Sequence, residues 1–476
     1  MLEYPKTFIT TRKNLILALN KKREEYRVIL SEHLKKKDSE LLNMKDLNFL
    51  KKIAFLLSSS RSGSSITASI LSQHAKRYKD SGNILLCLQG ELKPYFDLSQ
   101  LSPPFVDVYS NELDVYNTKD QAKINILLTE LFSEIGYPIG ETTDIMEFSI
   151  TIYGRILLQW PILEFGAAET VISKIYEIVK SISLNINGIP TYVDTSDTRI
   201  LLLKAIKKIF PELNLSFYDI PHTTISPIKS ACSYNIDSFI EEPPFIIPVP
   251  WHFATKEELA QGILFLKDPS NSWRIPFWRE ILRNHTISWL HLTRNVLESV
   301  NGLCNGWIYP FGFITNRSPK PLKIRGYTQD TLNYTQWYTN FSTSNRIWEL
   351  LLHEKSVDLE QVCSTQWADA HRSIINLVSE DKNYFKISSR DNPKQFGFEW
   401  LRAKPVEVIT QICEKLDIEL TQSLIDIAND INNQNVQVTQ GISRHPERWK
   451  VAENRNLIIK YSREPEILEI SQRLGY

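Results

Sequence analysis

One stretch of the chain, Ile53 to Leu71, combines an apolar run with a loop whose residue types could bind an anion. Ile53 to Leu57 are all apolar, a run that is long enough for a buried parallel strand and too short for a stable helix. Small polar residues and one arginine follow, and apolar residues at helical spacing resume at Ile66 and Ile70. The pattern predicts a strand, a tight loop and a helix. Serine hydroxyls and backbone N–H groups would then face one point at a helix N-terminus, where an anion is favoured.

The residues of this loop that we expect to hold the anion are Ser60, Arg61, Ser62, Gly63, Ser64 and Ser65. The usual nucleoside-triphosphate pattern GxxxxGK[ST] is absent, because the loop has no Gly-Lys pair and Arg61 is its only cation. An arginine before Ser-Gly-Ser, directly after an apolar strand, resembles the 5′-phosphosulfate loop of the sulfotransferases, which use 3′-phosphoadenosine 5′-phosphosulfate (PAPS). The alternative is a serine-rich turn that only caps a helix, so residues further along the chain must decide.

Two cations downstream stand where predicted strands end. Lys267 closes one apolar strand. Arg294 ends the next strand, before a helix that carries Ser299 and Asn301. The order resembles that of the sulfotransferases, in which the phosphosulfate loop is followed by a strand-end lysine and then by the arginine and serine that bind the 3′-phosphate of PAPS. The run HLTRNVLESVNGLCNGW is also similar to the HLTRNP-type segment of bacterial sulfotransferase-family proteins.

The chain departs from the family pattern in three places. Many relatives have a serine at the eighth position after the arginine, which is Gly302 in this chain, whereas Ser299 stands five positions after Arg294. Cytosolic sulfotransferases carry a histidine two positions after the strand-end lysine, and here that position is Pro269. The chain between Arg61 and Arg294 is also much longer than the family spacing, so we expect extra segments that fold outside the nucleotide site.

The catalytic base that the resemblance implies is Glu91, which follows a second predicted strand at 83–88. Gly90-Glu91 is similar to a Gly-Glu pair of the protein-tyrosine sulfotransferases, in the region that supplies their base. This pair and the Lys-Asp-Pro run at Lys267 are closer to that branch than to the cytosolic branch with its histidine base. Without the resemblance, a single Glu after a strand indicates a surface residue or a helix cap. His74 is the rival base, but it lies about two helical turns beyond Ser65, away from the anion end of its helix.

The resemblance also implies roles for Arg61, Lys267 and Arg444. Negative charge grows on the departing phosphate oxygens as a sulfuryl group leaves, and fixed cations such as Arg61 and Lys267 lower the barrier there. Arg444, in the run GISRHPERWK, is similar to a late basic loop that closes over the cofactor. Such a transfer requires no metal, and the chain has no acidic or His/Cys cluster that would predict one.

The elements that must position these residues follow an α/β plan. In two stretches, 190–221 and 262–295, a strand ends in a polar turn that contains aspartate, a helix follows, and a further strand closes the unit. Together with the resemblance, this plan predicts a three-layer P-loop-like sulfotransferase fold around a central parallel sheet. We expect an N-terminal helical extension at 1–50, with an amphipathic helix at about 11–37. The sulfotransferase domain would be 51–476, with 100–250 a largely helical insertion.

Composition and charge limit the classes of function. Lys+Arg and Asp+Glu both number 55, so no net charge draws the protein to nucleic acid or to an anionic membrane. The five cysteines show neither CxxC spacing nor clustering with histidine, which argues against a disulfide framework and a zinc site. The first residues lack a basic start followed by an apolar run, and no apolar segment is long enough for a membrane span. We therefore expect a cytoplasmic protein.

The resemblance implies a PAPS-dependent sulfotransferase, which moves a sulfuryl group from PAPS to a hydroxyl or nitrogen of an acceptor. A small-molecule acceptor, such as a specialised natural product, agrees best with the neutral charge, because a highly sulfated polysaccharide usually needs a basic groove. An aromatic-rich stretch, 306–344, could line the acceptor pocket or form an ordinary satellite core. Two alternatives stay open: a nucleotide-binding module without turnover, and a kinase-like phosphotransferase. The sequence predicts no oligomeric state.

Overall fold

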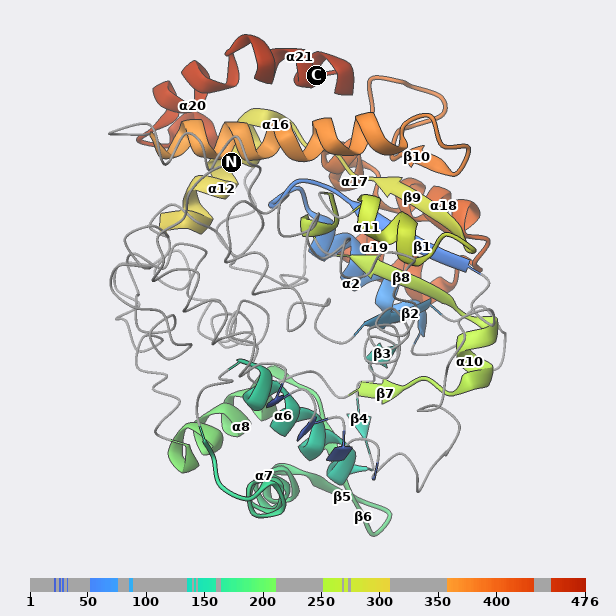
Figure 1. Ribbon diagram of the computed structural model, residues 1–476, viewed down its shortest axis with the longest axis vertical. Helices are drawn as coiled ribbons and strands as arrows, with labels where there is room; N and C mark the ends of the chain where they lie inside the picture. The colour runs from blue at the N-terminus through green and yellow to red at the C-terminus, as the bar shows by residue number, and fades with distance from the viewer. Residues whose placement is uncertain are drawn as a thin grey trace.

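The computed structural model describes a central sheet, the helices around it and part of the predicted insertion (Figure 1). The described residues are 21–22, 25–26, 28–29, 32, 52–75, 85–88, 135–138, 141–142, 144–159, 164–210, 251–267, 269–272, 275–308, 358–431 and 447–476. Within these ranges, no helix is both long enough and apolar enough to cross a membrane.

The main sheet, in the part of the chain that the structure describes, has seven strands in the spatial order β10-β9-β1-β8-β2-β3-β7. Their bounds are β1 Lys52–Leu57, β2 Leu85–Leu88, β3 Ile135–Pro138, β7 Trp251–Phe253, β8 Ile263–Lys267, β9 Thr286–His291 and β10 Tyr384–Lys386. The strands from β10 to β2 run parallel, whereas β3 is antiparallel to both of its neighbours. The predicted central parallel sheet is confirmed. The strand predicted from the apolar run at 53–57 is β1, and it lies between β8 and β9.

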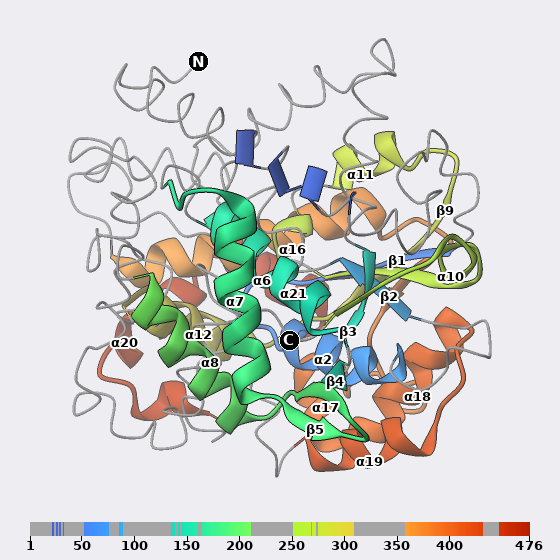
Figure 2. The ribbon, with the colours of Figure 1, turned by 90° about the horizontal axis from the view of Figure 1, so that it is seen from below.

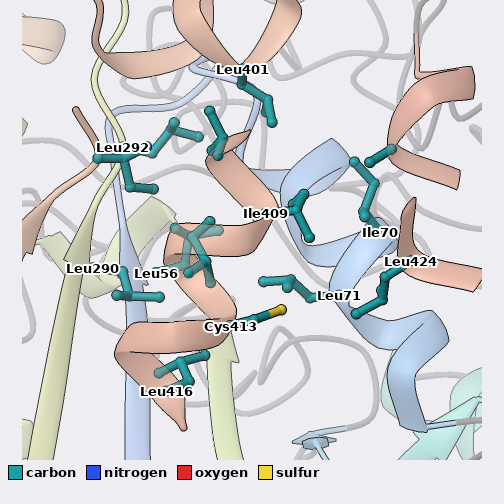
Figure 3. Close-up of a cluster of buried hydrophobic side chains, with 14 of the residues drawn as sticks. Leu56, Ile70, Leu71, Leu290, Leu292, Leu401, Ile409, Cys413, Leu416 and Leu424 are labelled. Carbon is teal, nitrogen blue, oxygen red and sulfur yellow. The ribbon is translucent and has the colours of Figure 1, made fainter. Parts of the chain in front are cut away.

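The helices of the sheet region form two groups. One group, α2 Ser64–Ala75, α17 Gly397–Ala403, α18 Pro405–Leu416 and α19 Gln422–Asp430, shares a buried apolar cluster with β1 (Figure 3). The other group contains α11 Ile275–Ile281, α12 Val296–Ile308, α16 Leu359–Val378, α20 Arg455–Ser462 and α21 Pro465–Leu474. Helix α10 Lys256–Gln261 and the 3₁₀ helices η6 Pro269–Ser272 and η7 Arg448–Val451 are short elements in the connections.

Helices cover both faces of the sheet, which explains why β1 is apolar along its length and does not alternate with polar residues. On one face, Ala54 and Leu56 belong to the cluster with α2 and α18. On the other face, Phe55 stacks on Trp289 of β9, with ring centroids 5.0 Å apart, and contacts Trp278 of α11. The mixed α/β plan with a helical layer on each side of the sheet is therefore observed.

The described part of 100–250 contains strands as well as helices. Helices α6 Ile145–Gln159, α7 Ala168–Ile182 and α8 Ser196–Ile209 accompany a small sheet of order β4-β6-β5, whose strands are β4 Glu141–Thr142, β5 Leu184–Ile186 and β6 Ile189–Val193. Figure 2 shows α6, α7 and α8 as neighbours. Ile135–Pro138 lies in the segment that we expected to be largely helical, yet it forms β3 of the main sheet, where pairing with β2 and β7 outweighs the local turn preference of its glycine and proline. The division of the chain into extension, domain and insertion stays a prediction.

The predicted amphipathic helix at 11–37 is described only at single positions between 21 and 32, which are helical. Its Tyr26 is 4% exposed and lies against Gly154 of α6, where an added Cβ would stand 2.3 Å from the ring. Lys22 Nζ donates to Glu164 Oε2 at 3.2 Å. This segment therefore packs on the predicted insertion through the face that carries Tyr26.

A chain of three hydrogen-bonded rings connects β9, β10 and α16. His291 Nδ1 lies 2.7 Å from Tyr384 Oη, and His291 Nε2 lies 2.8 Å from His371 Nδ1. Burial lowers the pKa of both histidines, that of His371 to about 3. Both imidazoles are therefore neutral in the folded protein at neutral pH, so that in their shared hydrogen bond one ring nitrogen donates and the other accepts.

These histidines predict a loss of stability at acidic pH. In the unfolded chain their pKa returns to about 6.5, so the unfolded state binds more protons below that pH. The contribution of the two histidines to the free energy of unfolding should be constant above pH 6.5. It should fall as the pH is lowered from 6.5 toward the pKa of the histidines in the folded protein. For each histidine the slope approaches about 1.4 kcal/mol per pH unit.

Urea unfolding at fixed pH steps measures this slope. In a folded His371→Gln protein, the free energy of unfolding should fall less steeply below pH 6.5. The slope should be smaller by about 1.4 kcal/mol per pH unit, which corresponds to one proton. A slope equal to that of the wild-type protein would contradict the prediction.

Candidate functional site

The loop between β1 and α2 turns through two residues with left-handed backbone conformation. Arg61 has a φ of 64° and Gly63 a φ of 87°, with Ser62 between them. Alternation of this kind directs successive backbone N–H groups to one side, where they form an anion-binding concavity. The loop also leads into α2, whose first turn carries N–H groups without intrahelical partners. The predicted succession of strand, loop and helix is confirmed.

The serines from Ser58 to Ser64 are buried, and some of their hydroxyls lack a partner among the residues that the structure describes. Ser59 Oγ and Ser62 Oγ lie 2.6 Å apart, and Ser272 Oγ of η6 donates to the Ser58 carbonyl at 2.7 Å. By contrast, the Oγ atoms of Ser58 and Ser60 are buried without a hydrogen bond. A buried polar group that is left unpaired costs about 1–3 kcal/mol. Such hydroxyls favour a loop that binds a ligand over a serine-rich turn that only caps a helix.

Lys267 lies at the carboxyl end of β8, next to the loop. It is the register partner of Leu56, the residue before the end of β1. Because side chains alternate along a strand, Lys267 continues the row of Ile263 and Phe265, which face the cluster shared with α2. Its side chain is buried, with 7% exposed. An ammonium group in this position raises the positive potential at the start of the loop.

Arg294 connects the loop with three helices. It follows β9, and its Nη1 donates to the Arg61 carbonyl at 2.7 Å while its Nη2 donates to Glu298 Oε2 of α12 at 3.0 Å. Its guanidinium lies over the Phe398 ring of α17, 4.9 Å from the centroid, and its carbonyl accepts from Trp367 Nε1 of α16 at 3.2 Å. Burial lowers the pKa of Arg294, and the nearby carboxylate of Glu298 acts against this shift. A guanidinium keeps its charge in proteins, so the loop has a fixed positive charge at its carbonyl side.

Helix α12 places Gly302 directly against the loop. A Cβ added to Gly302 would stand 3.2 Å from Arg61 Cβ, so the two segments approach closely. Ser299, about one turn earlier, is buried, and its Oγ has no partner in the part of the chain that is described. Asn301 is 7% exposed, and its Oδ1 accepts from Asn305 Nδ2 at 3.4 Å. Of the two α12 residues that we predicted to bind the cofactor, Ser299 has the unpaired polar atom.

Further residues around Arg294 were not found in the sequence analysis. Glu298 could have been found, because Arg294 and Glu298 have the i,i+4 spacing of a helical ion pair. Glu399 of α17 accepts from the Asn295 N–H at 2.9 Å and lies 3.0 Å from the Tyr476 hydroxyl. No local pattern connects Glu399 or Tyr476 with the loop, so only the tertiary fold shows their place.

Several predicted site residues are not placed by the structure. Glu91 and Arg444 lie outside the described residues. Ser65 and the rival base His74 lie in α2, and only their backbone is described. The structure thus brings together the loop, Lys267 and Arg294, while the roles of Glu91 and Arg444 stay predictions.

Comparisons with known proteins give two structural neighbours. No family model and no curated protein sequence matches the chain. The sulfotransferase domain from the curacin biosynthetic pathway is 12% identical, with a TM-score of 0.34, and the match covers 90% of this chain and 98% of that domain. The sulfotransferase domain from the olefin synthase of Synechococcus PCC 7002 is 13% identical, with a TM-score of 0.30. This match covers 90% of this chain and 96% of that domain. At these TM-scores the similarity assigns neither an activity nor a substrate.

The contact between Gly63 and Phe398 leads to a prediction about stability. A Cβ added to Gly63 would stand 2.1 Å from Phe398 Cδ2, in addition to the strain of its positive φ. Gly166 has a similar φ of 89°, but an added Cβ would meet nothing within 4 Å. Gly166→Ala should therefore cost only about 1–2 kcal/mol of backbone strain, and Gly63→Ala should cost clearly more. Urea unfolding measures both changes in the free energy of unfolding, and equal losses would contradict a tight contact between the loop and α17.

Proposed function

We propose that this protein is a sulfotransferase that moves a sulfuryl group from PAPS to a hydroxyl or nitrogen of a small-molecule acceptor. The observation that carries the proposal is the convergence of the anion loop with the cations Arg61, Lys267 and Arg294 at the carboxyl ends of three adjacent parallel strands. Ligands of open α/β sheets bind at this edge. The loop sequence has no Gly-Lys pair, which supports PAPS over a nucleoside triphosphate.

The residues at the site fit the charges of PAPS. The loop N–H groups and the unpaired hydroxyls of Ser58 and Ser60 would hold the 5′-phosphosulfate. Arg294 and the unpaired hydroxyl of Ser299 would hold the 3′-phosphate. Two anionic groups thus meet two sets of donors. PAPS supplies an activated sulfuryl group, whose bond to the bridging phosphate oxygen breaks as the bond to the acceptor forms.

The chain's own residues would contribute charge and proton transfer. Arg61 and Lys267 would face the phosphate oxygens on which negative charge grows, each contributing about 3–4 kcal/mol by analogy with oxyanion-hole donors. Glu91 would take the proton of a hydroxyl acceptor, which contributes about 10²–10⁴-fold. Arg444 would close over the nucleotide. A natural product of modest charge is the acceptor that the balanced composition supports, since the chain has as many acidic as basic side chains.

Transfer from radiolabelled PAPS to a panel of metabolites, or to an extract of the source cells, tests the reaction class. We expect a labelled product in equal yield with and without a chelator. Competition between 3′,5′-ADP and ATP tests the kinase-like alternative, since a phosphotransferase would prefer ATP. Binding of 3′,5′-ADP without transfer to any acceptor would favour a nucleotide-binding module.

The binding roles of Arg61 and Arg294 predict a loss of nucleotide affinity. Arg61→Ala and Arg294→Ala should each weaken binding of 3′,5′-ADP by roughly 1.5–3 kcal/mol, the contribution of a charge-assisted hydrogen bond. Calorimetry measures the change. Arg390→Ala is the matched control, because Arg390 is an exposed arginine paired with Glu414, and it should bind like the wild-type protein. Unchanged affinity in a folded Arg294→Ala protein would remove Arg294 from the 3′-phosphate site.

The catalytic roles proposed for Lys267 and Glu91 predict a larger effect on kcat than on nucleotide affinity. Lys267→Met should lower kcat more than it weakens 3′,5′-ADP binding, because the contact of Lys267 strengthens in the transition state. Glu91→Gln should abolish most turnover and leave the 3′,5′-ADP affinity nearly unchanged, because glutamine cannot take the proton of the acceptor. His74→Ala should change kcat little. Steady-state kinetics and calorimetry on the same preparations make the comparison. A normal kcat in Lys267→Met would leave Lys267 a structural residue, and a normal kcat in Glu91→Gln would favour an acceptor nitrogen that needs no strong base.

A further inference from the structure

The carboxylate of Glu298 holds two groups that belong to distant parts of the chain. Its Oε2 accepts from Arg294 Nη2 at 3.0 Å, and its Oε1 accepts from the backbone N–H of Glu447. Glu447 directly precedes η7. The Glu298 charge also acts on Arg448, where it opposes the lowering of the pKa by burial. Glu298 therefore connects Arg294 with the segment that begins at Glu447.

The pair of Arg294 and Glu298 differs from an ordinary surface ion pair. The two side chains are only 18% and 14% exposed, so water and salt screen their charges less than those of exposed pairs. Arg294 is also fixed by the Arg61 carbonyl and by the Phe398 ring. These two contacts hold the guanidinium in place. A change at this ion pair would therefore be a change in which anion contacts the guanidinium.

An anionic ligand at Arg294 meets Glu298 as a competitor. Both Nη groups of Arg294 already donate, Nη1 to the Arg61 carbonyl and Nη2 to the Glu298 carboxylate. A phosphate that binds Nη2 must take the place of this carboxylate, or must bind beside it against the repulsion between two negative charges. In either arrangement Glu298 lowers the affinity for the phosphate.

We propose that Glu298 is an internal competitor for the 3′-phosphate of the nucleotide, which neutralises Arg294 in the free protein and releases it when the nucleotide binds. The inference rests on the proposed function, since it takes Arg294 as the ligand of the 3′-phosphate. In the free protein, the Glu298 carboxylate is the counter-ion of the partly buried Arg294 guanidinium. By weakening the complex with 3′,5′-ADP, it also shortens the time for which the product occupies the site.

The affinities of Glu298→Gln for 3′,5′-ADP and for 5′-AMP test this proposal. Glutamine has the same size and keeps an oxygen that can accept from the Glu447 N–H, but it has no charge to compete for Arg294. The dissociation constant of 3′,5′-ADP should fall roughly fivefold or more. That of 5′-AMP, which has no 3′-phosphate, should change by less than about twofold. Glu298→Ala, which removes both contacts, should shift the 3′,5′-ADP affinity in the same direction.

Glu399→Gln separates direct competition from a general change of charge. The Glu399 carboxylate is also close enough to act on the pKa of Arg294. Its hydrogen bonds, however, come from the Asn295 N–H and the Tyr476 hydroxyl. Its removal should tighten 3′,5′-ADP less than the removal of Glu298. An equal gain in both variants overturns the proposal, as does unchanged or weaker binding in Glu298→Gln and Glu298→Ala. If the folded wild-type protein does not bind 3′,5′-ADP, the proposed function itself is overturned, and this inference with it.

Discussion

The hydrogen bond from Arg294 Nη1 to the Arg61 carbonyl is the contact on which the candidate site depends. It joins Arg294, three residues after the end of β9, to the middle of the loop that follows β1. Arg61 has a left-handed backbone conformation, which costs a residue other than glycine about 1–3 kcal/mol. A charge-assisted hydrogen bond to its carbonyl offsets this cost. The same contact therefore shapes the loop and places a second cation beside it.

The parallel sheet brings these residues together from distant parts of the sequence. Leu56 and Lys267 are register partners, as are Leu57 and His291, so β1, β8 and β9 end at the same edge. Beyond this edge, the hydrogen bond of Trp367 Nε1 to the Arg294 carbonyl supports the turn after β9. A loop with little regular structure is thus held by strands and helices that are packed on both sides.

The sequence predicts those parts of the fold that depend on local patterns. β1 and β8 are largely apolar because helices cover both faces of the sheet, and the polar residues where these runs stop indicate the site. The strand β3 could not be predicted, because its Gly136 and Pro138 favour a turn locally and belong to a strand only through pairing with β2 and β7. Likewise, no spacing in the sequence places Phe398 against Gly63 and Arg294, since this contact arises from the packing of α17 on the loop.

Arg61 gives a physical explanation for the glycine at 302, where the pattern that the sequence resembles has a serine. Glycine inside a helix costs about 1 kcal/mol relative to alanine, and an arginine with positive φ is also unfavourable, so neither residue is expected at its position alone. Together they are compatible, because the missing side chain of Gly302 leaves room for Arg61 Cβ, which would lie 3.2 Å from an added Cβ. A serine at 302 would crowd the Arg61 side chain. The hydroxyl that α12 can then offer to an anion at Arg294 is that of Ser299, which is buried without a partner among the described residues.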